Sequence, residues 1–239
     1  LSSLQSACSM VASRKLKKKT GGKEKQRKTL RKVCSEWKLS ELAVLNKLKT
    51  PALIQKFIDS LAYDNPKDKY WSVRATLRSR AGDCMGGALV AACCLDRIGL
   101  GPPRVVGFEA RNDDTHAVAV YQVNGLWGAL GKSNFTLIRA RDPVYRSLRE
   151  LVMSYFDFYF NTKGEKSLVG YSKPFHLNKT GDAWMYADGE VDRELADIDK
   201  KKKTPIIPIA RPSGKMLMQA PKYLLKAGLL GSNPRGLFK

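Results

Sequence analysis

The sequence lacks the features that define several common classes of protein. It has no run of about 18 apolar residues, so no segment is suited to cross a membrane as a helix. Its five cysteines are an odd number without a Cys-x-x-Cys pair, which argues against a disulfide scaffold and against a zinc finger. Gly86 and Gly87 are not followed by Lys and Ser or Thr, so no phosphate-binding loop is expected. We expect no metal, no cofactor and no small-molecule ligand.

Acidic residues are also missing from one end of the chain. Residues 201–239 carry nine Lys or Arg and no Asp or Glu, whereas residues 1–50 carry 14 against three. Residues 51–200 carry 20 against 19 and are nearly neutral, so the net charge of +21 lies at the two ends. This separation predicts a compact domain that is attached to a polyanion through its ends.

The charge distribution divides the chain into three parts. Residues 1–50 are predicted to form a basic N-terminal arm with a short helix over 36–49, because residues 14–32 contain too few apolar side chains to build a core. Residues 51–200 are long enough for one domain, and residues 201–239, with five prolines, are predicted to be an extended basic arm. The side chains expected to bind nucleic acid are Arg14, Lys15, Lys17, Lys18, Lys19, Lys23, Lys25, Arg27, Lys28, Arg31, Lys32, Lys201, Lys202, Lys203, Arg211, Lys215, Lys222, Lys226 and Arg235.

The apolar pattern of the centre predicts an α+β domain. Small apolar residues that follow Cys84 without a polar face indicate a buried helix, which ends near Gly99. The pair Asn124-Gly125 between two apolar runs indicates a β-hairpin. The predicted helices cover residues 51–61, 74–80, 84–98, 143–160 and 188–200, and the predicted strands cover residues 104–109, 117–123 and 126–130.

Cys84 and His116 are the candidates for chemistry. Cys84 is expected at a helix N-terminus, which can lower the pKa of a thiol, and His116 at the start of a strand, where it can accept the proton. The alternative for Cys84 is a buried thiol, and the alternative for His116 is a turn residue beside Asp113 and Asp114. We interpret Cys93, Cys94, Trp127, His176 and the aromatic residues of 155–160 as structural.

Three stretches of the chain carry a resemblance to a known family. They are AGDCMGGALVAACCL from residue 81, DDTHAVAVYQVNGLWGALGKSNF from residue 113 and RDPVYRSLRELVMSYFDFYFNTKGEKSL from residue 141. From about Phe57 to Ile207 the chain resembles the transglutaminase-like superfamily of Cys-His-Asp proteins, and more narrowly a group of uncharacterised bacterial members. The resemblance implies a core in which a buried helix that bears the cysteine packs on an antiparallel sheet, with helical flanks. Both basic arms lie outside it.

The resemblance also implies roles for individual residues. Cys84 would be the nucleophile and His116 the base. The family pattern places an Asp about four residues after a Trp on the returning strand, but here Trp127 is followed at that distance by Gly131. The nearest polar residues are Ser133 and Asn134, and we take Asn134 as the third member because an amide can orient an imidazole.

The charge pattern and the resemblance together suggest a function. We expect a structural subunit of an organellar ribosome, most simply a mitochondrial one in the matrix, in which a transglutaminase-like domain binds rRNA and neighbouring ribosomal proteins through its basic arms. A start at Leu1 rather than Met is what removal of a targeting segment, or an incomplete sequence, would leave. The alternatives are an active cysteine hydrolase or acyltransferase that uses Cys84 and His116, a scaffold subunit of another mitochondrial assembly, and a location in another organelle or the cytoplasm.

Overall fold

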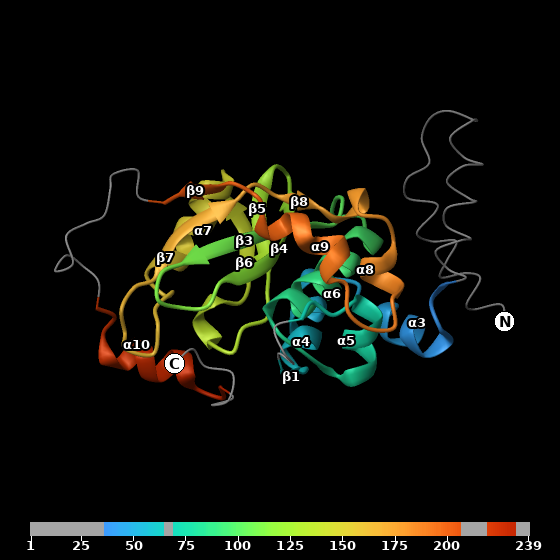
Figure 1. Ribbon diagram of the computed structural model, residues 1–239, viewed down its shortest axis with the longest axis horizontal. Coiled ribbons are helices and arrows are strands. Elements are labelled where there is room, and N and C mark those ends of the chain that lie inside the picture. Colours follow the sequence, from blue (N-terminus) through green and yellow to red (C-terminus); the bar gives the residue numbers. More distant parts are fainter. Residues whose placement is uncertain (1–35, 65–68, 207–218, 233–239) are drawn as a thin grey trace.

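The computed structural model describes residues 36–64, 69–206 and 219–232 (Figure 1). Within these ranges the chain forms eight α-helices and nine strands, and the strands of the large sheet are all antiparallel. The predicted α+β class is therefore confirmed. The basic residues predicted between 14 and 32 lie outside the described residues, as do Arg211, Lys215 and Arg235.

One large sheet runs through the centre of the molecule. Its strand order is β6-β5-β4-β3-β7-β9, and β8 pairs with the beginning of β3. A separate parallel pair of short strands, β1 (Ala62–Tyr63) and β2 (Ala81–Gly82), precedes the central helix. The strands of the large sheet are β3 (Arg104–Ala110), β4 (His116–Val123), β5 (Leu126–Leu130), β6 (Arg141–Tyr145), β7 (Leu168–Ser172), β8 (Phe175–His176) and β9 (Lys203–Pro205).

The hairpin between β4 and β5 confirms the turn that the sequence predicts. Asn124 has a φ of 51° and Gly125 a φ of 82°, so both central residues have the left-handed conformation that a tight two-residue hairpin turn requires. The register pairs Val123 with Leu126 directly across this turn. The turn thereby fixes which residues of β4 face each side of the sheet.

Helix α6 (Cys84–Arg97) covers one face of the sheet. All residues from Met85 to Leu95 are buried, as predicted for a helix without a polar face. It packs against Val105, Ala117 and Ala119 of the sheet on one side and against surrounding helices on the other, and together they form the first core. Those helices are α3 (Leu39–Leu45), α4 (Pro51–Asp59), α5 (Val73–Ser79), α8 (Ala183–Tyr186) and α9 (Asp192–Asp199).

The opposite face of the sheet carries a second core. The alternate residues Val106, Phe108, Val118 and Val120 point to this side and contact Leu151, Val152 and Tyr155 of α7 (Leu148–Phe156). The sheet therefore separates two apolar layers, one beneath α6 and one beneath α7.

The sequence predicted a single helix over residues 143–160, and this was wrong. Residues 141–145 form β6, an edge strand of the described sheet, and Pro143 is tolerated because one side of β6 has no strand partner among the described residues. The helix begins only after Ser147, whose hydroxyl accepts a hydrogen bond from the Glu150 N–H at 3.1 Å.

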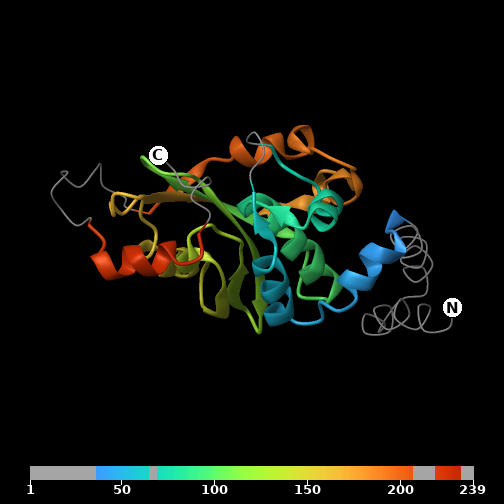
Figure 2. The same cartoon turned by 90° about the horizontal axis from the view of Figure 1, so that it is seen from below.

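The predicted extended arm over residues 201–239 also needs correction in the described part. Lys203–Pro205 pairs with β7 as the last strand of the sheet, and Ile206 is buried in the second core. Residues 222–229 form α10 (Lys222–Leu229), at the opposite end of the molecule from α3 (Figure 2). The physical reason is the apolar content of this segment, which can be buried against the sheet and the loops.

The N-terminal boundary of the folded part likewise differs from residue 51. Trp37, Leu45 and Leu48 are buried in the first core, and an ion pair of Arg74 with the buried Glu41 joins α5 to α3 at 3.1 Å. Residues 36–50 therefore pack as part of the domain. The predicted helix over 36–49 is real but shorter, because helix α3 spans Leu39–Leu45.

Candidate functional site

Cys84 begins helix α6, and its neighbours hold that helix start in place. The N-cap residue is Asp83, whose carboxylate accepts a hydrogen bond from the Gly86 N–H at 2.8 Å. Position 86 requires a small residue, because a Cβ atom there would lie 3.2 Å from the Thr76 hydroxyl of α5. The Cys84 thiol is half-buried and hydrogen-bonds to the main chain of Ala117 on β4.

The surroundings of Cys84 disfavour its thiolate. Burial is the larger cause and the Asp83 carboxylate the second, and both raise the pKa of the Cys84 thiol well above its usual value. The hydrogen bond with the Ala117 main chain lowers this pKa by less. The direction is opposite to the expected activation at a helix N-terminus, first because the thiol is buried and second because the Asp83 carboxylate occupies that N-terminus.

His116 is the first residue of β4 and is buried. Its Nε2 lies 3.0 Å from the carbonyl oxygen of Ile138, so this nitrogen carries the proton of the neutral ring and donates it to the hydrogen bond. The ring lies beside Phe108 and Tyr159, two residues of the second core. Burial is the main cause that lowers the pKa of His116 to about 4. The hydrogen bond to the Ile138 carbonyl acts in the opposite direction and raises this pKa, whereas the positive charge of Arg141 lowers it further.

Cys84 and His116 lie on neighbouring elements, but the pKa shifts of the thiol and the imidazole do not favour proton transfer between them. Within residues 36–64, 69–206 and 219–232, no hydrogen bond joins the thiol to the imidazole. Transfer of the thiol proton to the ring requires a low thiol pKa and a higher imidazole pKa, and both shifts go the other way. Burial raises the pKa of Tyr63, Asp113 and Tyr159 as well, so this region favours neutral groups.

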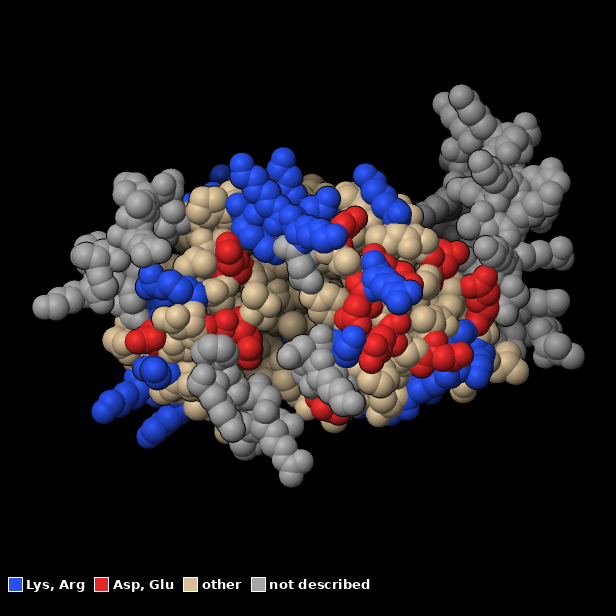
Figure 3. Space-filling view, viewed as in Figure 1, with Lys and Arg blue, Asp and Glu red and all other residues tan. Residues whose placement is uncertain are grey.

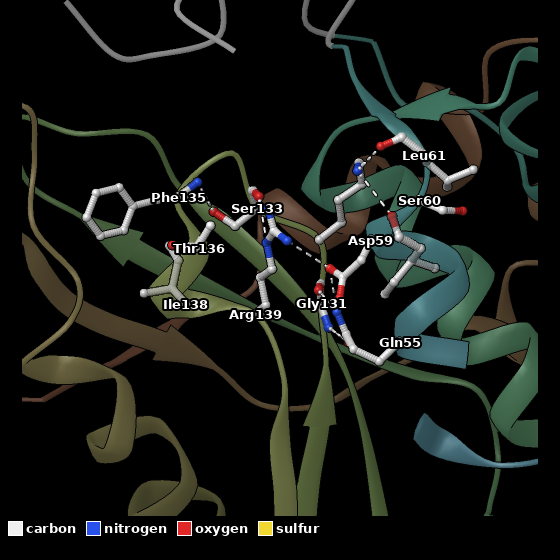
Figure 4. Close-up of polar contacts among 12 residues, drawn as sticks. Gln55, Asp59, Ser60, Leu61, Gly131, Ser133, Phe135, Thr136, Ile138 and Arg139 are labelled. Atoms are coloured by element: carbon white, nitrogen blue, oxygen red, sulfur yellow. Dashed lines mark hydrogen bonds and ion pairs between the residues drawn. The ribbon is translucent and has the colours of Figure 1, made fainter. Parts of the chain in front are cut away.

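Main-chain contacts surround the position at which the resemblance predicts a third catalytic residue. At that position, Gly131, a Cβ atom would lie 2.9 Å from Val118. The N–H and the carbonyl of Gly131 are both bonded to the side chain of Gln55 from α4, at 3.2 and 2.9 Å (Figure 4). The partner of His116 Nε2 is a main-chain carbonyl rather than the side chain of Asn134. The role of the buried Asn134 stays a prediction.

A pocket opens beside His116 where β4 begins. Helix α10 closes one side of it: the Thr136 hydroxyl donates to the carbonyl of Ala227 at 2.8 Å, and Gly228 lies against the ring of Phe135. In the described part of the chain, Cys84 is not among the residues that line this pocket. The lining residues are Tyr63, Asp113, Asp114, Thr115, His116, Ser133, Asn134, Phe135, Ile138, Tyr159, Phe160, Asn161, Thr162 and Leu229.

Lys132 is a buried residue of this region that the sequence did not reveal. Its ammonium group donates to the carbonyl oxygens of Ile58 at 3.1 Å and of Leu61 at 2.6 Å, where α4 ends. Burial lowers the pKa of Lys132 to about 8. Nearby, Arg139 pairs with Asp59 at 3.1 Å (Figure 4). A lysine after a strand usually lies in solvent, and its partners here are main-chain atoms that no residue pattern indicates.

The predicted nucleic-acid ligands that can be placed lie in two regions. Lys201 and Lys202 are exposed just before β9, and Lys203 lies on that strand. Lys222 and Lys226 are exposed on α10. Lys and Arg side chains gather on the surface over β8 and the segment that leads to β9 (Figure 3).

Comparison with known proteins does not assign the chain to a family. The chain matches no model of a known protein family, and no curated protein is similar to it. Among the described residues, no group of three or more His, Cys, Asp or Glu side chains could hold a metal ion. None of the helices in the described ranges has the length and apolar character needed to cross a membrane.

Proposed function

We propose that this protein is a structural subunit of an organellar ribosome, most simply a mitochondrial one, and that it binds rRNA through its basic ends. The observation that carries the proposal is the separation of charge: a net charge of +11 in residues 1–50, +1 in residues 51–200 and +9 in residues 201–239. Phosphate neutralisation by Lys and Arg is the strongest sequence-independent source of affinity for RNA.

The candidate catalytic site supports a structural role rather than catalysis. The thiol of Cys84 is held in its protonated form, and the neutral imidazole of His116 donates to the Ile138 carbonyl instead of receiving the thiol proton. The transglutaminase-like domain then serves as a rigid body, a pseudoenzyme that presents its surface and its ends to neighbouring rRNA and proteins.

The test is co-sedimentation with mitochondrial ribosomes over a salt titration. A variant in which the Lys and Arg residues of 14–32 are changed to Gln should dissociate at much lower salt than the wild type, since each phosphate that is no longer neutralised removes close to one unit of the log–log salt slope. A control variant carries Gln at the exposed Lys47, Lys49 and Lys56. Equal sedimentation of all three proteins in high salt would reject the proposal. Crosslinking without recovery of rRNA would instead favour a scaffold subunit of another mitochondrial assembly.

A second candidate is a cysteine hydrolase or acyltransferase. The observation in its favour is that Cys84 begins α6 and contacts Ala117, the residue after His116. An electrophilic thiol probe at neutral pH distinguishes the two functions. Selective labelling of Cys84 that is lost in His116→Ala would support the enzyme, and labelling slower than a free thiol would support the structural role.

A further inference from the structure

Helix α10 is held on the domain by a small contact. Gly228 is its buried residue, and neither apolar core contains a residue of α10 in the described part of the chain. The exposed residues of the helix are Lys222, Tyr223, Lys226 and Ala227. The side chains that build the two cores would therefore keep their contacts with one another if α10 left the domain.

The contact itself requires a glycine. A Cβ atom at position 228 would lie 1.6 Å from the ring of Phe135, so the helix and the loop after β5 meet at Gly228. The Thr136 hydroxyl reaches the same place and lies 2.8 Å from the carbonyl oxygen of Ala227 and 3.3 Å from that of Gly228. Glycine weakens a helix, but here it allows this close approach. Gly228 therefore serves the docking of α10 rather than its helical conformation.

The chain is also attached to the domain just before α10. The Ala220 N–H donates to the carbonyl oxygen of Gly164 at 2.7 Å, and Gln219 forms an isolated bridge with Glu165. These main-chain contacts lie in the segment before β7 and include no residue of α10. Because they can stay in place while the helix moves, this attachment is suited to act as a hinge.

Helix α10 covers the pocket beside His116. Leu229 lines this pocket, and so does Phe135, on which Gly228 packs. The pocket holds about 60 Å³, which is room for a few water molecules, and only 5% of the His116 surface is exposed. Departure of α10 removes Leu229 from the wall and opens the pocket on that side.

We propose that α10 is a detachable cover, which closes the pocket beside His116 and opens while the rest of the domain stays folded. The inference goes beyond the proposed function and does not depend on it. Elements with few buried contacts open at a lower free energy than the whole domain. A helix of eight residues is not stable alone in water, so α10 should also lose its helical hydrogen bonds when it opens. Access to His116 is then controlled by the C-terminal segment of the chain.

The first experiment measures the reaction of the two histidines of the full chain with diethyl pyrocarbonate at pH 7, resolved by peptide mass spectrometry. His176 is half-buried at the surface and serves as the internal reference. Burial lowers the pKa of both imidazoles, so both are mostly neutral at this pH and the two rates report access. In the wild type, His116 should react at least about tenfold more slowly than His176, because the covered state dominates.

Gly228→Ala is the test variant. It favours the helix but prevents its close docking on Phe135, so His116 should react about tenfold faster than in the wild type, with no change at His176. Thr136→Val weakens the same contact from the side of the loop and should give a smaller increase, about threefold. Tyr223→Ala is the matched control on α10, since 70% of Tyr223 is exposed, and it should change neither rate.

Amide hydrogen exchange separates opening of the cover from unfolding of the domain. In the wild type the amides of α10 should exchange faster than those of β3 and β4, because the helix opens while the sheet stays paired. Gly228→Ala should accelerate exchange in α10 and leave the sheet unchanged.

The inference would be overturned by any of four results. They are equal His116 rates in the wild type, Gly228→Ala and Thr136→Val, a wild-type His116 that reacts as fast as His176, α10 amides that exchange only together with those of β4, and loss of cooperative unfolding in Gly228→Ala. The last two would show that α10 is an integral part of the fold. None of these measurements involves RNA, so failure of the cover and failure of the proposed function are distinguishable.

Discussion

Lys132 and Arg104 are basic residues beside the same sheet, but the fold surrounds them differently. The Lys132 ammonium is buried and donates to two carbonyl oxygens at the end of α4. The Arg104 guanidinium is half-buried, and its Nε–H has no partner in the described part of the chain. The first charge is satisfied by main-chain carbonyls, whereas the second lies over the ring of Trp127 and keeps one buried N–H without a partner in the described residues.

This difference separates a buried charge whose hydrogen bonds stabilise the fold from one whose buried N–H contributes no hydrogen bond within the described residues. Substitution of a satisfied buried charge leaves main-chain carbonyls without donors, and the effect appears as reduced stability. Substitution of a charge with an unsatisfied buried N–H removes a desolvation cost, so stability is kept. The predictions that follow test this division at successive sites.

The largest effect is expected at Lys132. Lys132→Met retains the aliphatic part of the side chain but removes both hydrogen bonds to Ile58 and Leu61, so the free energy of unfolding should fall by about 3 kcal/mol. Urea unfolding followed by circular dichroism measures this value. Lys47→Met, at an exposed position, is the control and should change stability by less than about 0.5 kcal/mol. A decrease below about 1 kcal/mol for Lys132→Met would contradict the assignment.

The pH dependence of stability gives an independent check on Lys132. Its pKa is lowered to about 8 in the folded protein, whereas a lysine of the unfolded chain has a pKa of about 10.4. Between these values the unfolded chain binds more protons, so the free energy of unfolding of the wild type should rise with pH relative to Lys132→Met. Below pH 8 both states are protonated and the difference should be constant. A relative fall between pH 8 and 10 would reject the lowered pKa.

The next largest effect is expected at Gly131, the position at which the resemblance to transglutaminase-like proteins predicts an Asp. Gly131→Asp should lower the free energy of unfolding by about 2 kcal/mol, because its Cβ would be only 2.9 Å from Val118. It should not speed the reaction of Cys84 with a thiol probe. Gly189→Asp is the matched control, since a Cβ at Gly189 meets nothing within 4 Å. A stable Gly131→Asp variant in which Cys84 reacts faster with the thiol probe would contradict this prediction. It would show that the site lacked only a carboxylate to activate the thiol.

The sequence allowed prediction of the elements whose structure is determined locally. The hairpin at Asn124-Gly125 and the buried helix after Cys84 follow from turn chemistry and from residue size, and both are confirmed. The strand β6 was missed because its residues 141–145 run directly into an apolar helical pattern, and Pro143 suited a helix start as well as an edge strand.

The site was less predictable because its electrostatics depend on distant residues. The position of Cys84 at a helix start could be predicted, but the effect of Asp83 on its pKa required the N-cap geometry. The contact of His116 with Ile138 joins residues 22 positions apart through a loop, and no local pattern indicates it.

A smaller effect is expected in the reactivity of Cys84. Alkylation by iodoacetamide should be at least about tenfold slower than that of a small-molecule thiol at pH 7.5, because each unit by which the pKa rises reduces the thiolate fraction about tenfold. The rate should keep rising with pH above the usual thiol range without a plateau. The variant Asp83→Asn should react faster, because the second cause of the raised pKa is removed. A plateau below pH 8 in the wild type would contradict the raised pKa.

The smallest change in stability is expected at Arg104, where the two kinds of basic residue differ most. Arg104→Gln removes a guanidinium whose Nε–H is buried without a partner in the described part of the chain, so the free energy of unfolding should stay within about 0.5 kcal/mol of the wild type or rise. A decrease in stability comparable to that of Lys132→Met would mean that Arg104 serves the fold, and the distinction between the two residues would fail.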